Sequence, residues 1–152
     1  MIKGIIRKSW PLNAYNFEDE KNFISYDIEK DHRLLCAKAF TAVQTDSETI
    51  VPFLGTAQIL TVFPSVVVDM GAIKFVCNGA KIMRPGITEF DAFTKGDFVT
   101  VKDEKFLKTL AIGRALEDSV VAFRNAKGYV LDNLHYVGDE FWETYKEINP
   151  KS

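Results

Sequence analysis

Glycine and proline divide the second half of this 152-residue chain into short segments, which excludes long helices there. After Pro64, apolar and polar residues alternate in the runs DFVTV, TLAIGRAL and GYVLDNLHYV, which lie beside glycine turns. Alternation with a period of two is typical of strands that bury one face. Many short strands with one or two short helices predict a small, mostly β barrel.

The chain before Pro64 has a different pattern. Two apolar-rich runs, LLCAKAFTAVQT and TIVPF, flank the polar cluster Asp46-Ser47-Glu48, which predicts a hairpin. GTAQILTVF predicts a short helix that stops at Pro64, because proline lacks the amide hydrogen that a helix interior needs. We therefore expect two domains, residues 1–63 and residues 64–152.

The stretch DMGAIKFVCNGAKIMRPGI, residues 69–87, concentrates small and bend-forming residues. Residues 65–68 ahead of it predict a buried strand of β-branched residues. Asp69 can cap a short helix, because its carboxylate can accept a backbone N–H of the first turn. Gly79 suits the left-handed conformation that ends helices.

The second half of this stretch predicts a strand over residues 80–84 and then a turn. Pro85-Gly86 matches the central pair of a type II turn, in which glycine supplies the positive φ. The stretch carries no acid after its first residue, but it has three cations: Lys74, Lys81 and Arg84.

Charge and composition bound the partners. The formal net charge is -2 and the pI is near 5.7, so the chain is not expected to coat nucleic acid indiscriminately, although a local basic patch remains open. No window approaches the ~20 apolar residues of a membrane span, and the start lacks a signal-peptide core. Cys36 and Cys77 have neither redox nor zinc-site spacing, so we expect reduced, buried thiols in a cytoplasmic protein without membrane contact.

Residues 68–87 resemble the opening strand, helix and strand of the PUA domain, named for pseudouridine synthases and archaeosine transglycosylases. The resemblance rests on two Gly-Ala pairs, at 71–72 and 79–80, followed by Pro85-Gly86-Ile87. The closing segment resembles the version in the malignant-T-cell-amplified-sequence family and its archaeal relatives through Asn133-Leu134-His135-Tyr136-Val137-x-Asp139-x-x-Trp142. Val51-Pro52-Phe53-Leu54 resembles the end of that family's pre-PUA domain, where relatives usually have threonine in place of Phe53.

The resemblance implies an α+β protein, in which an N-terminal pre-PUA α/β domain is followed by a mostly β PUA pseudobarrel. It also implies binding of structured RNA, either tRNA or rRNA, through the first PUA helix, the strand after it and nearby loops. In this family it further implies a role in translation initiation or ribosome recycling at the small ribosomal subunit, with a translation factor as partner.

RNA offers phosphates, 2′-hydroxyls and base faces, and proteins that read its shape contact mainly the backbone. Glycine and alanine leave backbone N–H groups uncovered, lysines supply point charges, and the planar fork of arginine can hold a phosphate with two hydrogen bonds. We therefore predict an RNA-binding site formed by Lys74, Asn78, Gly79, Ala80, Lys81, Arg84, Pro85, Gly86 and Arg114.

Motifs for catalysis are not evident. The chain has neither a Gly-x-Ser-x-Gly elbow nor a phosphate-binding Gly-Lys-Ser/Thr loop, and its two histidines fall in different predicted domains. Asp31-His32 with Cys36 suggests a metal site only weakly, because no further ligand is evident. We expect no enzymatic activity, no cofactor and no metal. Periodic aromatic residues are assigned to the core or to domain contacts: Phe75, Phe98, Phe123 and Trp142.

A protein-interaction adaptor is the competing hypothesis. In it the N-terminal domain docks a translation factor or a ribosomal protein, and the acidic segment FEDEKNFISYDIEKD complements a basic partner. Salt separates the two hypotheses, because binding through several phosphates weakens steeply with ionic strength.

Overall fold

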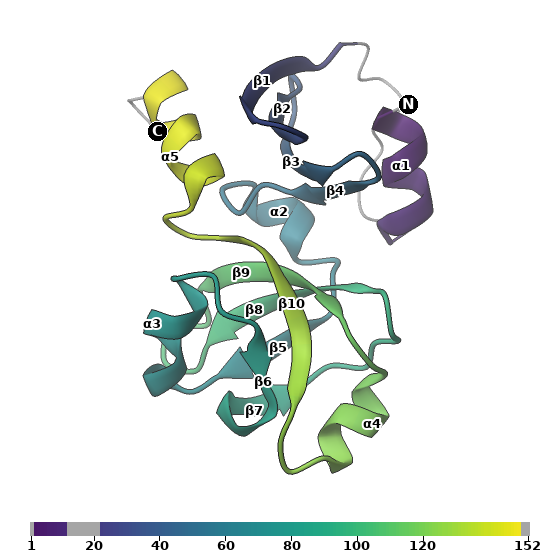
Figure 1. Cartoon of the computed structure of the whole chain (residues 1–152), viewed down its shortest axis with the longest axis vertical. Coiled ribbons are helices and arrows are strands. Elements are labelled where there is room, and N and C mark those ends of the chain that lie inside the picture. The colour runs from purple at the N-terminus through teal and green to yellow at the C-terminus, as the bar shows by residue number, and fades with distance from the viewer. Residues whose placement is uncertain (1, 12–21, 150–152) are drawn as a thin grey trace.

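The computed structural model describes residues 2–11 and 22–149 and has two stacked lobes (Figure 1). The first lobe contains a four-stranded antiparallel sheet in the order β1-β2-β3-β4. Its strands are β1 (Ile24–Glu29), β2 (His32–Cys36), β3 (Thr41–Asp46) and β4 (Thr49–Pro52). The predicted hairpin is confirmed as β3–β4, in which Val43 pairs with Val51.

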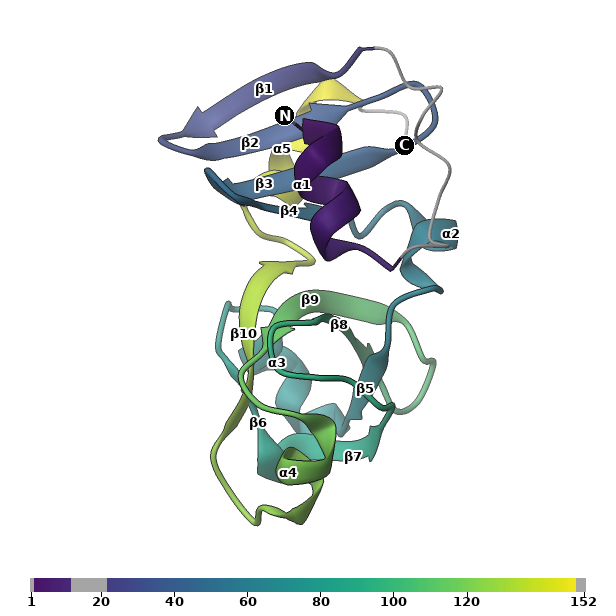
Figure 2. The same ribbon diagram turned by 90° about the vertical axis from the view of Figure 1, so that its right-hand side faces the viewer.

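Three helices complete the first lobe: α1 (Ile2–Ser9), α2 (Ala57–Leu60) and α5 (Glu140–Ile148). Figure 2 shows α1 on one face of the sheet and α5 on the other. The helix predicted before Pro64 is confirmed as the one-turn α2. Helix α1 was not predicted, although Ile2, Ile5 and Ile6 share a face and Ile6 is fully buried.

The second lobe contains a six-stranded sheet that curls into a half-barrel, in the order β6-β10-β9-β8-β5-β7. Only β5 and β8 pair in parallel among the described strands. The strands are β5 (Ser65–Val68), β6 (Ile82–Met83), β7 (Ile87–Phe90), β8 (Phe98–Asp103), β9 (Thr109–Ala115) and β10 (Tyr129–Tyr136). Two short helices accompany them, α3 (Ile73–Val76) and α4 (Ser119–Arg124), with the 3-10 turns η1 (Met70–Ala72) and η2 (Arg84–Gly86).

The strand predictions for the second lobe are confirmed. DFVTV lies in β8, TLAIGRA is β9, and GYVLDNLHYV contains β10. The turn before β8 contains Gly96 with a φ of 93°, and SVVAFR forms α4. The predicted mixed class, with helices and strands in both parts and a mostly β second part, is therefore correct.

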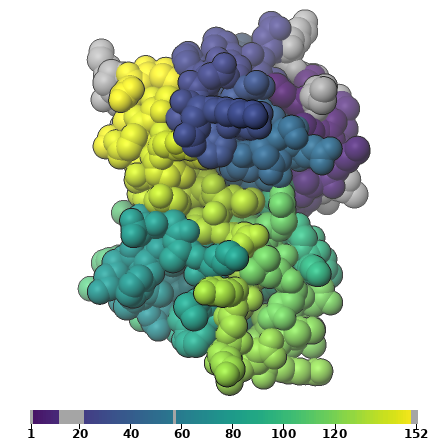
Figure 3. Space-filling view, in the orientation of Figure 1, coloured from purple at the N-terminus to yellow at the C-terminus, as the bar shows by residue number. Residues whose placement is uncertain are grey.

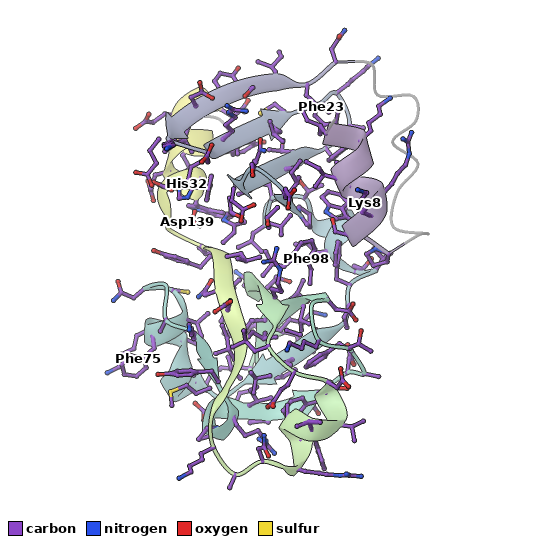
Figure 4. The ribbon with its side chains drawn as sticks, turned by 45° about the vertical axis from the view of Figure 1, so that its right-hand side comes forward. Lys8, Phe23, His32, Phe75, Phe98 and Asp139 are labelled. Carbon is purple, nitrogen blue, oxygen red and sulfur yellow. The ribbon has the colours of Figure 1, made fainter. Side chains whose placement is uncertain are left out.

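Buried side chains form two apolar clusters. One fills the half-barrel and includes Val66, Val101 and Leu131. The other fills the first lobe and continues across the junction to Phe98 and Ile112 of the second sheet. Figure 4 shows Phe98 between the lobes. The lobes therefore meet through apolar packing rather than through a linker alone.

The two cysteines are free and half-buried, and burial raises the pKa of both thiols. A raised pKa lowers the thiolate fraction, which makes Cys36 and Cys77 poor nucleophiles. Among the described residues, no helix has the length and apolar character needed to cross a membrane.

Asp103 organises the turn between β8 and β9. Its carboxylate accepts hydrogen bonds from the backbone N–H groups of Phe106 at 2.6 Å, Lys105 at 2.9 Å and Lys108 at 3.1 Å. These bonds, that of Phe106 above all, outweigh desolvation and hold the pKa of Asp103 below its usual range. The turn holds Leu107 at a φ of 55°, which few residues other than glycine adopt.

We expect the Asp103→Asn variant to have a lower Tm than the parent at pH 7 and a shallower loss of stability in acid. Because the folded pKa is lowered, the carboxylate stabilises the fold above the ordinary pKa of about 3.9, and this stabilisation is lost as pH falls through the lower folded value. Thermal unfolding at a series of pH values checks this, with the exposed Glu147→Gln variant as control. A Tm difference that stays constant into acid contradicts it.

Candidate nucleic-acid interface

The helix after β5 begins as the sequence predicts. Asp69 caps the η1 turn, because its carboxylate accepts the N–H of Ala72 at 3.0 Å. Val76 of α3 is buried, with Ile73 and Cys77 half-buried on the same face.

Gly79 ends this helical segment with a φ of 90°. The N–H of Ala80 then returns to the carbonyl of Phe75 at 3.0 Å, which closes the turn. A side chain at Gly79 would be strained and would lie 3.2 Å from the ring of Tyr136.

The turn at Pro85-Gly86 differs from the prediction. Arg84, Pro85 and Gly86 form the 3-10 turn η2, and Gly86 is not among the described glycines with positive φ, so the type II assignment is wrong. Packing explains the glycine instead: a Cβ there would lie 3.3 Å from that of Ala72, while the Gly86 carbonyl accepts the N–H of Asp69 at 2.9 Å. The expected strand over residues 80–84 is shortened to β6 for the same reason, because η2 begins at Arg84.

An open pocket of about 370 Å³ lies between the η1–α3 segment and the β6–η2 segment. Its walls are mainly apolar side chains and main chain, and Phe75 and Met83 at its rim are 58% and 49% exposed. In Figure 3 this part of the chain forms one side of the second lobe, beside β10. The lining residues are Val68, Asp69, Gly71, Ala72, Phe75, Val76, Ala80, Lys81, Ile82, Met83, Pro85 and Gly86.

Two of the four aromatic residues assigned to the core or to domain contacts are instead exposed. Phe75 projects from α3 into solvent (Figure 4), and Phe123 is 64% exposed. Helix α3 has a single turn, so only Val76 points fully inward and its neighbour Phe75 does not. Phe98 is buried at the junction, and Trp142 stacks on Phe53, as predicted.

The two lysines of the predicted site have exposed head groups. The Nζ of Lys74 lies 5.1 Å from the centroid of the Phe75 ring, and that of Lys81 lies 5.2 Å from the Tyr129 ring. Lys81 also pairs with the carboxylate of Asp132 at 3.6 Å. This acid comes from β10, so the surface is less positive than residues 70–87 alone suggest.

Arg84 is held by the fold rather than offered to solvent. Its guanidinium donates to the carbonyls of Ile87 at 3.1 Å and Phe123 at 3.3 Å, and it lies 4.9 Å from the centroid of the Phe90 ring. The arginine therefore ties η2 to β7 and α4, and two of its donors are already used.

Arg114 lies on β9 at the junction between the lobes and is not part of the pocket wall. Its Nη2 donates to Thr49 Oγ1 at 2.8 Å, and its guanidinium lies 5.6 Å from the centroid of the Phe98 ring. Desolvation raises the pKa of Asp46, but the hydrogen bonds from Glu48 and Thr49 and the charge of Arg114 outweigh it, so this pKa is lowered. Arg114 thus connects the second sheet to the β3–β4 turn.

Asn133 fixes the bend that forms one wall of the pocket. Its Nδ2 donates to the carbonyls of Val76 and Ala80, each at 3.0 Å. Asn78 and Gly79, which lie between these carbonyls, are exposed. The sequence-based site omitted Asn133. A polar residue inside the apolar run YVLDNLHYV was the available signal.

His135 is fully buried where β10 meets the first lobe. The N–H of Leu54 donates to its Nε2 at 3.2 Å, so Nδ1 carries the proton and donates to Asp139 Oδ2 at 2.7 Å. Asp139 also caps α5 by accepting the N–H of Trp142 at 2.9 Å. One histidine therefore joins the two lobes and the start of α5.

Comparison with known proteins gives matches over the second lobe. Residues 64–137 match the family model of the PUA domain. An uncharacterized protein of Methanocaldococcus jannaschii is 47% identical over 78 residues, which are 51% of this chain and 48% of that protein. Translation machinery-associated protein 20 of Saccharomyces cerevisiae is 37% identical over 87 residues, with 53% and 48% covered. Malignant T-cell-amplified sequence 2 of Homo sapiens is 34% identical over 105 residues, with 62% and 58% covered.

The chain spans about half the length of these curated relatives. Solved structures resemble nearly all of it. A hypothetical protein of Pyrococcus horikoshii has a TM-score of 0.75 at 25% identity, covering 93% of this chain and 90% of that one. A conserved PUA domain protein of Thermoplasma acidophilum has a TM-score of 0.67 at 21% identity, covering 94% and 90%. The fold of both lobes is thus a known arrangement.

Proposed function

This chain is a PUA-domain protein related to translation machinery-associated protein 20 and the malignant-T-cell-amplified-sequence proteins, and on this premise we propose that it binds structured RNA, a tRNA or an rRNA, without catalysing a reaction. The observation that supports this most strongly is the open pocket between η1–α3 and β6–η2. It combines exposed apolar side chains, main chain without bulky side chains, and two lysines at its margin.

Each of these components suits a different part of RNA. Phe75 at the rim offers a ring face on which an unpaired base can stack. Lys74 and Lys81 offer mobile point charges for phosphates. Gly71 and Gly86 bring main chain to the pocket without side chains, so a sugar-phosphate strand can approach closely.

The predicted site residues take different roles in this proposal. Lys74 and Lys81 contact phosphates, while the surface beneath the RNA is formed by Asn78, Gly79, Ala80, Pro85 and Gly86. Arg84 holds η2 in place, and Arg114 holds the lobes together, because their guanidinium groups already have protein partners. Asn133 joins the site as the residue that fixes its bend.

The relatives' names suggest the cellular setting. One group is named as associated with the translation machinery, so we propose a translation-linked role in the cytoplasm, in initiation or recycling. The small ribosomal subunit and a translation factor are the partners that fit this role.

We expect the double variant Lys74→Ala/Lys81→Ala to bind tRNA about tenfold more weakly than the parent at about 0.1 M salt. Each lost phosphate contact also removes released counterions, so the slope of log K against log salt falls by about 1.4 to 1.8 in magnitude. Fluorescence anisotropy with labelled unfractionated tRNA, repeated at several salt concentrations, measures both quantities.

The matched control is Lys95→Ala/Lys105→Ala, which removes two exposed lysines that do not line the pocket. It carries the same net charge as the test variant, so it separates a local contact from a general charge effect. Equal affinity of the two double variants contradicts the proposed surface. Unfolding curves check that both variants remain folded.

The adaptor hypothesis has one observation in its favour. β1 is an edge strand of the first sheet, with Ile24 60% exposed and the side chain of Asp27 77% exposed. An unpaired strand edge can add a strand from a partner. Residues 17–21 of the acidic segment lie outside the described residues. Capture of a translation factor that persists at high salt supports this hypothesis.

A further inference from the structure

Three potential metal ligands converge where the first sheet meets the start of α5. Nδ1 of His32 lies 2.9 Å from Glu29 Oε1 and also contacts Oε1 of Glu140. One ligand atom from each residue lies within 4.8 Å of the others. The cluster joins two segments more than a hundred residues apart, and the ring of His32 is only 32% exposed.

The backbone brings each ligand to this point. In the β1–β2 hairpin the register shifts between Asp27 and Glu29, so Glu29 pairs directly with His32. Asp31 closes the turn at a φ of 65°. Glu140 is the first residue of α5, whose start is fixed by the Asp139 cap.

Packing also supports the imidazole ring. The His32 ring centroid lies 5.5 Å from that of Phe141, which is buried in the core directly after Glu140. Figure 4 shows His32 beside the start of α5, near Asp139. The ring that carries the ligand nitrogen is thus positioned before any ion arrives.

Hydrogen bonding alone does not satisfy this cluster. An imidazole Nδ1 carries at most one hydrogen, yet two carboxylate oxygens approach it. The two carboxylates also repel each other, and a cation between them relieves that repulsion. A divalent ion bound by one neutral imidazole and two carboxylates gives a site with no net charge.

We propose that Glu29, His32 and Glu140 bind a divalent transition-metal ion, with Zn²⁺ as the representative. A nitrogen ligand with two carboxylates favours zinc over Mg²⁺ and Ca²⁺, which prefer oxygen ligands. Three protein ligands leave one tetrahedral position for water or for a group from a partner. The two partly exposed glutamates can rotate to the wider spacing that zinc needs.

The bound ion links the β1–β2 hairpin to α5 and strengthens the hold of the C-terminal helix on the first sheet. None of the three ligands lines the RNA pocket. The site therefore goes beyond RNA binding, and it stands or falls independently of the proposed function.

Isothermal titration of the full chain with Zn²⁺ tests the site after metal has been removed with EDTA and dialysis. The expected result is one ion per chain with a micromolar Kd. His32→Phe keeps a ring beside Phe141 but removes the nitrogen ligand, and it weakens binding by at least about tenfold, as does Glu140→Gln. Glu29→Gln tests the third ligand on an exposed strand end, where folding is not at risk.

Glu143→Gln is the matched control, because Glu143 lies on the same helix and pairs with Lys146 at 3.7 Å instead. It binds zinc like the parent. Zinc at a hundredfold excess over Kd also raises Tm by about 5 to 10 °C in the parent and the control, but not in His32→Phe. Binding only above about 100 μM Zn²⁺, which marks weak adventitious contact, overturns the proposal. So does micromolar binding that survives both His32→Phe and Glu140→Gln.

Discussion

Replacing Gly113 with alanine is expected to lower the free energy of unfolding by about 3 kcal/mol or more, or to prevent folding of the second lobe. A Cβ at this position would lie 2.1 Å from the carbonyl oxygen of Asp132 and 3.2 Å from Cβ of Leu131. The first contact is with main chain, so a side-chain rotation cannot relieve it. β10 has to move away from β9.

The strand that must move is the one that fixes the pocket. Gly113 pairs with Asn133, and the register of β10 shifts between Asn133 and His135. Asn133 holds the bend after α3 through two carbonyls, so a displaced β10 also loosens the proposed RNA surface.

Urea unfolding followed by circular dichroism measures the effect. Gly4→Ala is the control, since a Cβ at Gly4 meets no atom within 4 Å and alanine favours the helix α1. The control is expected to be neutral or more stable by up to about 1 kcal/mol. A Gly113→Ala protein as stable as the parent contradicts the β9–β10 register described above.

The second large effect is expected for His135→Ala, which should lower the free energy of unfolding by about 2 to 4 kcal/mol. The variant leaves the buried N–H of Leu54 without its acceptor and removes a donor from the Asp139 carboxylate. It also opens a cavity beside the stacked ring of Phe53, 5.4 Å from the histidine centroid. Unsatisfied buried groups and a cavity act in the same direction.

Urea unfolding in the presence of EDTA checks this prediction. His32→Ala is the comparison, because it removes the other histidine from a half-exposed position, and its cost is expected to stay below about 1 kcal/mol. A cost for His135→Ala no larger than that of His32→Ala contradicts the role of His135 in joining the lobes.

Much of the second lobe was predictable because its local signals agree with its tertiary structure. Pro64, Asp69 and Gly79 each act through the backbone of their own neighbourhood, and the structure has each in the predicted role. Gly86 is the instructive exception. Its glycine is required by the nearby Ala72, which sits fourteen positions earlier in the chain, and a turn rule that considers four residues cannot include that contact.

The site was harder to predict than the fold, because charge and exposure depend on distant segments. Lys81 meets Asp132 from β10, and Arg84 meets the carbonyl of Phe123 from α4. Phe75 follows an aromatic pattern usual for cores, but a helix of one turn has room for only one inward side chain. The cluster of His32 with Glu140 was likewise hidden, since its ligands come from opposite ends of the chain.

The apolar packing of Phe98 and Ile112 against the first lobe has a consequence for anyone who wishes to divide this molecule. A fragment cut to the family match at residues 64–137 would present both side chains to water and lose the helix that follows His135. Such a fragment would be sticky and prone to self-association. The unit of inheritance is therefore smaller than the unit that dissolves and folds well, and soluble material is best sought from the intact chain.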